Sequence, residues 1–188
     1  MHFDEFVQAN QLHVAPVEQC EGLQVEVGLP PDWDPFQSSP GMRIWVWRND
    51  PCRETFCANA VLTMNRVDSP LDPAAVFTML CGQQVHALPD SQELRRELAA
   101  ATEGPGVTGV FDMSITAEVG RVDSLSLSRI VADDQRTWIT QLTVTALADS
   151  PVDRTGIWLR IRTVGGAIDP ESIAQPGAPL AGSEGGRR

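Results

Sequence analysis

The sequence of 188 residues contains no lysine and no tyrosine, so its basic residues are arginines and three histidines. We attribute both absences to compositional bias rather than to chemistry. Positive charge is also scarce, because 14 arginines stand against 25 acidic residues and the net charge is -11 with neutral histidines. A surface that binds nucleic acid must be basic to replace the counterions of the phosphates, so this balance argues against a nucleic-acid partner. It also disfavours docking on anionic lipid.

Long apolar segments are missing as well. No stretch approaches the roughly 18 apolar residues that a membrane-spanning helix needs. The N-terminus has none of the basic stretch, apolar stretch and small-residue cleavage site of a signal peptide. We therefore expect no membrane span and a cytoplasmic protein, or a secreted or lipid-anchored protein if the native start lies upstream of Met1.

The four cysteines form no recognisable metal motif. Cys52, Cys57, Cys81 and His86 are the best zinc candidates, but they lack a close cysteine pair on a shared turn. We predict no metal and no cofactor. A disulfide between Cys52 and Cys57 is expected only in an oxidising compartment, and free thiols in the cytoplasm. Cys81, His86 and Asp90 are poor candidates for a catalytic triad, because they project from different faces of one predicted helix.

The apolar spacing of the sequence predicts both helices and strands. Asp72 followed by proline is typical of a helix start, and helices are predicted at residues 3–10, 73–85 and 91–101. Alternating apolar residues predict strands at residues 24–29, 42–48, 59–67, 109–118, 125–131, 137–147 and 156–164. Because strands dominate and their joins are short, we predict an α+β fold with a largely antiparallel sheet flanked by helices.

The length suits one domain with a sizeable core. We place this domain at residues 1–166 and predict that the Gly/Pro-rich residues 167–188 form a disordered tail. The expected core includes seven side chains from the predicted helices and strands: Val61, Leu62, Phe77, Leu80, Leu94, Val144 and Ile161.

Four segments of the chain resemble one known family. They are FDEFVQANQLHVAPV at residues 3–17, LPPDW at 29–33, NAVLTMNRVDSPLDPAAVF at 59–77 and TWITQLTV at 137–144. In this order they are similar to the LpqN/LpqT group of mycobacterial lipoproteins. The resemblance implies a PsbP-like α/β/α sandwich, a scaffold of adaptors and partner-binding proteins more than of enzymes. Compared with this family, we expect the chain to lack the lipid-bearing cysteine at its start and the family's last helix.

The best candidate for a partner-binding surface carries tryptophan and arginine side chains. Trp45 and Trp47 share one face of a predicted strand, and Trp158, Arg160 and Arg162 share one face of the last predicted strand. In one interpretation, the tryptophans simply pack beneath the N-terminal helix. In the other, the absence of the last helix leaves part of the sheet uncovered, and Trp and Arg on that patch form an interface.

These features together favour a non-enzymatic binding or adaptor protein. We expect it to engage a protein partner, a second copy of the chain or an apolar ligand through the Trp/Arg face of the sheet. One alternative is a small hydrolase or transferase whose site is scattered along the sequence. A second alternative is an envelope lipid carrier, if the native start lies upstream.

Overall fold

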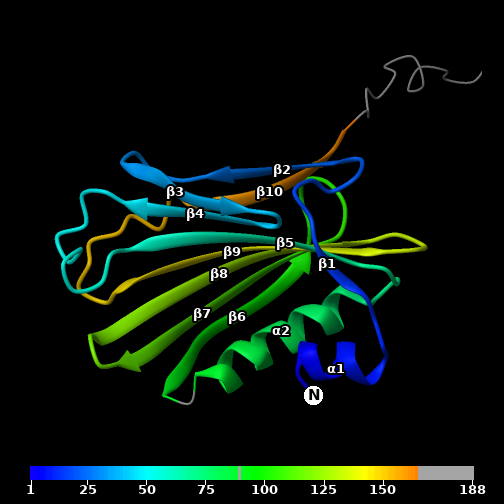
Figure 1. Cartoon of the computed structure of the whole chain (residues 1–188), viewed down its shortest axis with the longest axis horizontal. Helices are drawn as coiled ribbons and strands as arrows, with labels where there is room; N and C mark the ends of the chain where they lie inside the picture. The colour runs from blue at the N-terminus through cyan, green and yellow to red at the C-terminus, as the bar shows by residue number, and fades with distance from the viewer. Residues whose placement is uncertain (89, 165–188) are drawn as a thin grey trace, which may run out of the picture.

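The computed structural model describes residues 1–88 and 90–164 (Figure 1). The predicted tail at residues 167–188 lies outside the described residues. The elements, in chain order, are α1 (Phe3–Ala9), β1 (Val14–Pro16), β2 (Leu23–Gly28), β3 (Trp33–Ser39), β4 (Met42–Trp47), β5 (Asn59–Val67), α2 (Pro73–Ala87), β6 (Ser91–Ala100), β7 (Val107–Ala117), β8 (Gly120–Ala132), β9 (Thr137–Leu147) and β10 (Trp158–Thr163).

The strands form one large sheet and one two-stranded ribbon. The large sheet has the order β3-β4-β5-β9-β8-β7-β6, with β1 paired to the end of β5. The ribbon consists of β10 and β2. Every strand pair among the described residues is antiparallel. The predicted α+β class with a largely antiparallel sheet is therefore confirmed.

The two faces of the large sheet carry different layers. Both helices lie against one face, below the sheet in Figure 1, and the β2–β10 ribbon crosses the other face above it. On the helix side, Phe3 of α1 and Phe77 of α2 pack with Phe111 and Ile139 of the sheet. On the ribbon side, Leu159 belongs to a separate apolar cluster with sheet residues. Because alternate side chains of a strand point to opposite faces, each central strand contributes to both clusters.

Helix α2 begins at the Asp72–Pro73 pair, as predicted from the sequence. The Asp72 carboxylate accepts a hydrogen bond of 3.1 Å from the backbone N–H of Ala74, and Pro73 occupies the first helical turn. Proline fits there because its missing N–H would have no helical partner. Four predicted core residues are fully buried and two are half-buried: Leu62, Phe77, Val144 and Ile161, and then Val61 and Leu80.

The predicted helix at residues 91–101 is wrong, because this segment is the edge strand β6. Its glutamate, arginine, leucine and alanine residues favour a helix locally. The open edge of β7 offers the backbone a ladder of hydrogen bonds along the whole segment, and this tertiary pairing overrides the local preference. As a consequence, Leu94 is 55% exposed and is not a core residue. The strand β3, with a bulge between Pro35 and Gln37, was not predicted at all.

Candidate functional site

The predicted alternation along the last strand is present in the structure. Leu159 and Ile161 of β10 point toward the large sheet and are buried. Trp158, Arg160 and Arg162 point the other way, to the outer face of the ribbon, where Trp158 is 37% exposed. A single strand thus separates core from surface by the two-residue period of its backbone.

Trp158 lies flat on the ribbon because its cross-strand partner is Gly28. A side-chain carbon at Gly28 would lie 2.0 Å from the indole nitrogen of Trp158, so only glycine leaves room for the ring. The guanidinium carbon of Arg160 stands 4.6 Å from the centroid of the Trp158 ring, within the range of a cation–π contact.

The charges on this outer face are balanced. The Arg160 guanidinium lies 3.4 Å from a carboxylate oxygen of Glu103, and that of Arg162 lies 3.5 Å from a carboxylate oxygen of Glu26. Since exposed ion pairs of this kind contribute little to stability, they order the surface more than they hold the ribbon in place.

Trp45 and Trp47 lie on the other side of the ribbon, within the sheet beneath it. Trp45 packs against the ribbon-side cluster, and Trp47 is half-buried beside Trp33 of β3. Phe3 belongs to the cluster on the opposite face, so these tryptophans do not pack beneath the N-terminal helix. The structure therefore does not bring the five predicted residues together but divides them between the two sides of the ribbon.

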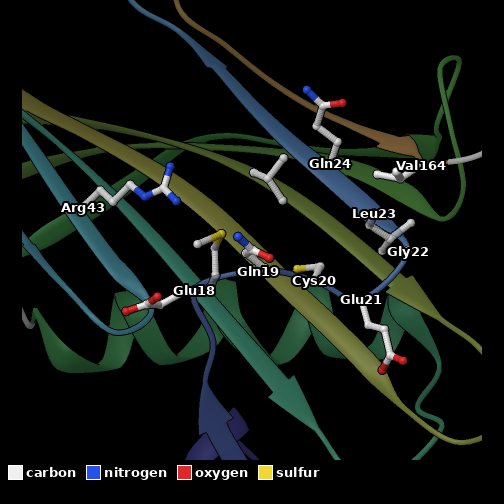
Figure 2. A pocket seen from close by; sticks show the side chains of 11 residues that line it. Glu18, Gln19, Cys20, Glu21, Gly22, Leu23, Gln24, Arg43 and Val164 are labelled. Atoms are coloured by element: carbon white, nitrogen blue, oxygen red, sulfur yellow. The ribbon is translucent and has the colours of Figure 1, made fainter.

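A hollow of about 720 Å³ opens where β2 begins to cross the sheet (Figure 2). Residues 18–25 form one wall, and Arg43, Met64 and Val164 complete the lining. We call it the Arg43 groove. Cys20 and Met64 are buried in its floor, and Leu23 and Val25 are half-buried. Figure 2 shows Arg43 at one end and Val164 at the other, with Gln19 and Cys20 between them.

Arg43 is exposed and has no hydrogen-bond or ion-pair partner among the residues that the structure describes. It also lines two neighbouring hollows, of about 360 Å³ and about 340 Å³, the second of them beside Phe36 and Trp45. Arg43 was not among the site residues predicted from the sequence. The available signal was its place on the same strand face as Trp45 and Trp47, but that pattern does not reveal a groove above it.

The described residues form no cluster of reactive side chains that is typical of a catalytic or metal site. None of them form a group of three or more His, Cys, Asp or Glu side chains that could hold a metal ion. Burial raises the pKa of the Cys81 thiol to about 11, which leaves almost no thiolate at neutral pH. His86 is exposed on α2 and stacks on His2, with 4.4 Å between the ring centroids. Cys52 and Cys57 are free thiols.

Asp133 serves the backbone of a turn rather than a reaction. One of its carboxylate oxygens accepts hydrogen bonds from the backbone N–H groups of Gln135 and Arg136, at 2.7 and 2.8 Å. These bonds, first of all the one from Gln135, lower the pKa of Asp133.

Neither of the two helices of the described chain has both the length and the apolar character needed to span a lipid bilayer.

No family model matches the sequence, and a search of curated proteins found no match to it. Among solved structures, the fold is similar to that of LpqN from Mycobacterium tuberculosis, a protein described as involved in cell envelope biogenesis. The TM-score is 0.64 and the identity 19%, over 79% of this chain and 87% of LpqN. The predicted likeness to the LpqN group is confirmed for the fold.

Two further solved structures share less of the arrangement. A protein from Bacteroides thetaiotaomicron has a TM-score of 0.40 and 10% identity, over 75% of this chain and 46% of that one. The lipid transfer and protein localization domain of human StarD13 has a TM-score of 0.25 and 7% identity, over 62% of this chain and 75% of that one. Both scores are too low to bear on this protein.

Proposed function

We propose that this protein is a non-enzymatic binding protein that holds an apolar or amphiphilic ligand in the Arg43 groove. The observation that carries the proposal is the groove itself, which joins a floor of buried Met64 and Cys20 to a polar rim. Its volume of about 720 Å³ falls within the range of about 300–1,000 Å³ that is typical of small-molecule sites. Such sites combine mostly apolar walls with a few polar groups that orient the ligand.

The chemistry of the groove supports binding rather than catalysis. Its one thiol, Cys20, is buried, and burial raises the pKa of that thiol. None of the described residues that line the groove is histidine, the residue that most often transfers protons near neutral pH. A scattered hydrolase or transferase site would need titratable groups that converge on one point. The envelope-carrier alternative places the same binding activity in another compartment.

An uncharged apolar probe tests this proposal. We expect N-phenyl-1-naphthylamine to fluoresce more strongly on addition of the protein and to saturate at one site. Val164 is 64% exposed on the wall of the groove, so Val164→Asp should not prevent folding. It should weaken probe binding about three- to tenfold, because it replaces apolar contact surface by a charge.

Leu98→Asp is the matched control, because Leu98 is an exposed apolar residue of β6, outside the groove. This variant should bind the probe like the unchanged protein. Absence of saturable binding, or equal weakening by both substitutions, would exclude the groove as an apolar site.

The outer face of the ribbon supports a second candidate function, association with a protein through Trp158, Arg160 and Arg162. The specific observation is an exposed indole beside charges of both signs, since Arg160 and Arg162 stand next to Glu103 and Glu26. A face that carries both signs can pair with itself across a two-fold axis. We therefore take a second copy of the chain as the partner.

Trp158→Ala tests this second candidate. An aromatic anchor at the centre of an interface contributes about 2 kcal/mol or more, so the dimer dissociation constant should rise about 30-fold. The midpoint of thermal unfolding at low protein concentration should change much less, because Trp158 is not a core residue. Sedimentation equilibrium over a range of concentrations measures the first quantity and circular dichroism the second. A monomer at all concentrations, with its tryptophans shielded from a quencher, would exclude self-association.

A further inference from the structure

We infer that the ligand of the Arg43 groove is a single-chain amphiphile with a carboxylate head group, and that Arg43 binds the carboxylate. The inference rests on the proposed function and names the chemical class of its ligand. It follows from the position of one unpartnered cation beside an apolar floor, and from the charges around it.

Arg43 differs from nearly all other arginines of the described chain. Most of them contact an acidic side chain, as Arg136 contacts Glu21 at 2.5 Å, and Arg129 donates to two backbone carbonyls. Arg43 and Arg53 are the exceptions, and only Arg43 lines the groove. A guanidinium that is always charged and has no partner among the described residues is available to an anion from outside.

The sheet itself supplies no partner for Arg43. Its cross-strand neighbours are Ser38 on β3 and Leu62 on β5, neither of which carries a charge. The guanidinium presents a planar set of donors that matches the two oxygens of a carboxylate. Among the described residues, neither neighbouring strand therefore provides a carboxylate for Arg43, and a ligand can supply it.

The surroundings of Arg43 specify what the carboxylate is attached to. Met64 and Val25 line the groove together with Arg43, and Leu23 lies near Val164 at the other end (Figure 2). A hydrocarbon chain that begins at the carboxylate would follow this apolar surface and leave the water. A fatty acid of medium length has this combination of groups, whereas a purely polar anion would leave the apolar floor unused.

The acidic residues at the rim of the groove allow a second test, because they affect the affinity for a negatively charged ligand. Glu21 is neutralised by Arg136, but Glu18 is exposed and has no ion-pair partner among the described residues. Glu18 lines the groove and one neighbouring hollow together with Arg43. It should therefore repel a carboxylate ligand, and its removal should strengthen binding of that ligand.

The experiment compares decanoate with decanol, which has the same chain but no charge, as competitors of N-phenyl-1-naphthylamine at neutral pH. We expect the unchanged protein to bind decanoate about tenfold more tightly than decanol, the size of one charge-assisted hydrogen-bond pair. Arg43→Gln should abolish this preference and leave decanol binding unchanged. Arg53→Gln is the control, because it removes another exposed, unpartnered arginine outside the groove.

Glu18→Gln should increase the affinity for decanoate about two- to threefold without changing that for decanol. Glu54→Gln, an exposed glutamate outside the groove, should change neither. Equal binding of decanoate and decanol, or an unchanged preference in Arg43→Gln, would overturn the carboxylate inference and leave the apolar site intact. If neither compound displaces the probe, both the inference and the proposed function fail.

Discussion

Replacing Phe77 by alanine is expected to lower the free energy of unfolding by about 3–5 kcal/mol, the usual cost of removing a buried aromatic ring. Phe77 is 2% exposed and joins α2 to the sheet within the helix-side cluster. Without the ring, α2 loses its largest fully buried side chain, and a cavity remains because the backbone around it is held by strand pairing. Urea unfolding followed by far-ultraviolet circular dichroism measures the change.

A companion substitution tests whether the ring and the sheet fit as closely as the structure indicates. A side-chain carbon at Gly109 of β7 would lie 2.3 Å from the Phe77 ring. Gly109→Ala should therefore destabilise the protein by about 1–3 kcal/mol through overpacking. Combined with Phe77→Leu, it should cost less than the sum of the two single changes, because the smaller side chain leaves room. Strict additivity would show that the two residues are not in contact.

These two substitutions also provide a control for the binding experiments. Phe77 and Gly109 act on the helix side of the sheet, whereas the Arg43 groove opens on the ribbon side. At temperatures where the variants stay folded, their affinity for the naphthylamine probe should be unchanged. A loss of affinity without unfolding would mean that the two faces are coupled.

Asp50→Ala is expected to lower the free energy of unfolding by about 2–4 kcal/mol, because buried donors would lose their acceptor. The Asp50 carboxylate is 2% exposed. It accepts hydrogen bonds from the backbone N–H of Cys52 at 2.9 Å, from that of Ala58 at 2.7 Å and from the Ser150 hydroxyl at 3.0 Å. These bonds close the loop between β4 and β5 and attach it to the segment after β9.

Asp50→Asn distinguishes lost hydrogen bonds from lost volume. Its amide keeps the size of the carboxylate and one acceptor oxygen, but its NH₂ group meets at least one N–H donor. We expect it to cost about half as much as the alanine change, that is about 1–2 kcal/mol. Asp149→Ala is the control, since Asp149 has only a weak contact with the Cys52 thiol, at 3.9 Å. An Asp50→Ala protein as stable as this control would show that the loop does not depend on Asp50.

Local sequence patterns determined most of the elements of this fold. The cap at Asp72, the alternation along β10 and the length of α2 all follow from residues that are close neighbours in the chain. Such signals survive because hydrogen-bonded caps and the two-residue strand period depend on the local backbone. The likeness to the LpqN group, carried by short segments in order, was enough to predict the class of fold.

The tertiary structure alone decided the state of residues 91–100 and the position of the site. Segment β6 has the composition of a helix, and only the free edge of β7 makes it a strand. The Arg43 groove exists because the ribbon of β2 and β10, which are far apart in sequence, lies over one face of the large sheet (Figure 1). The sequence alone places Arg43 on the same strand face as Trp45. What lies above that face depends on pairing between distant strands, which no local pattern records.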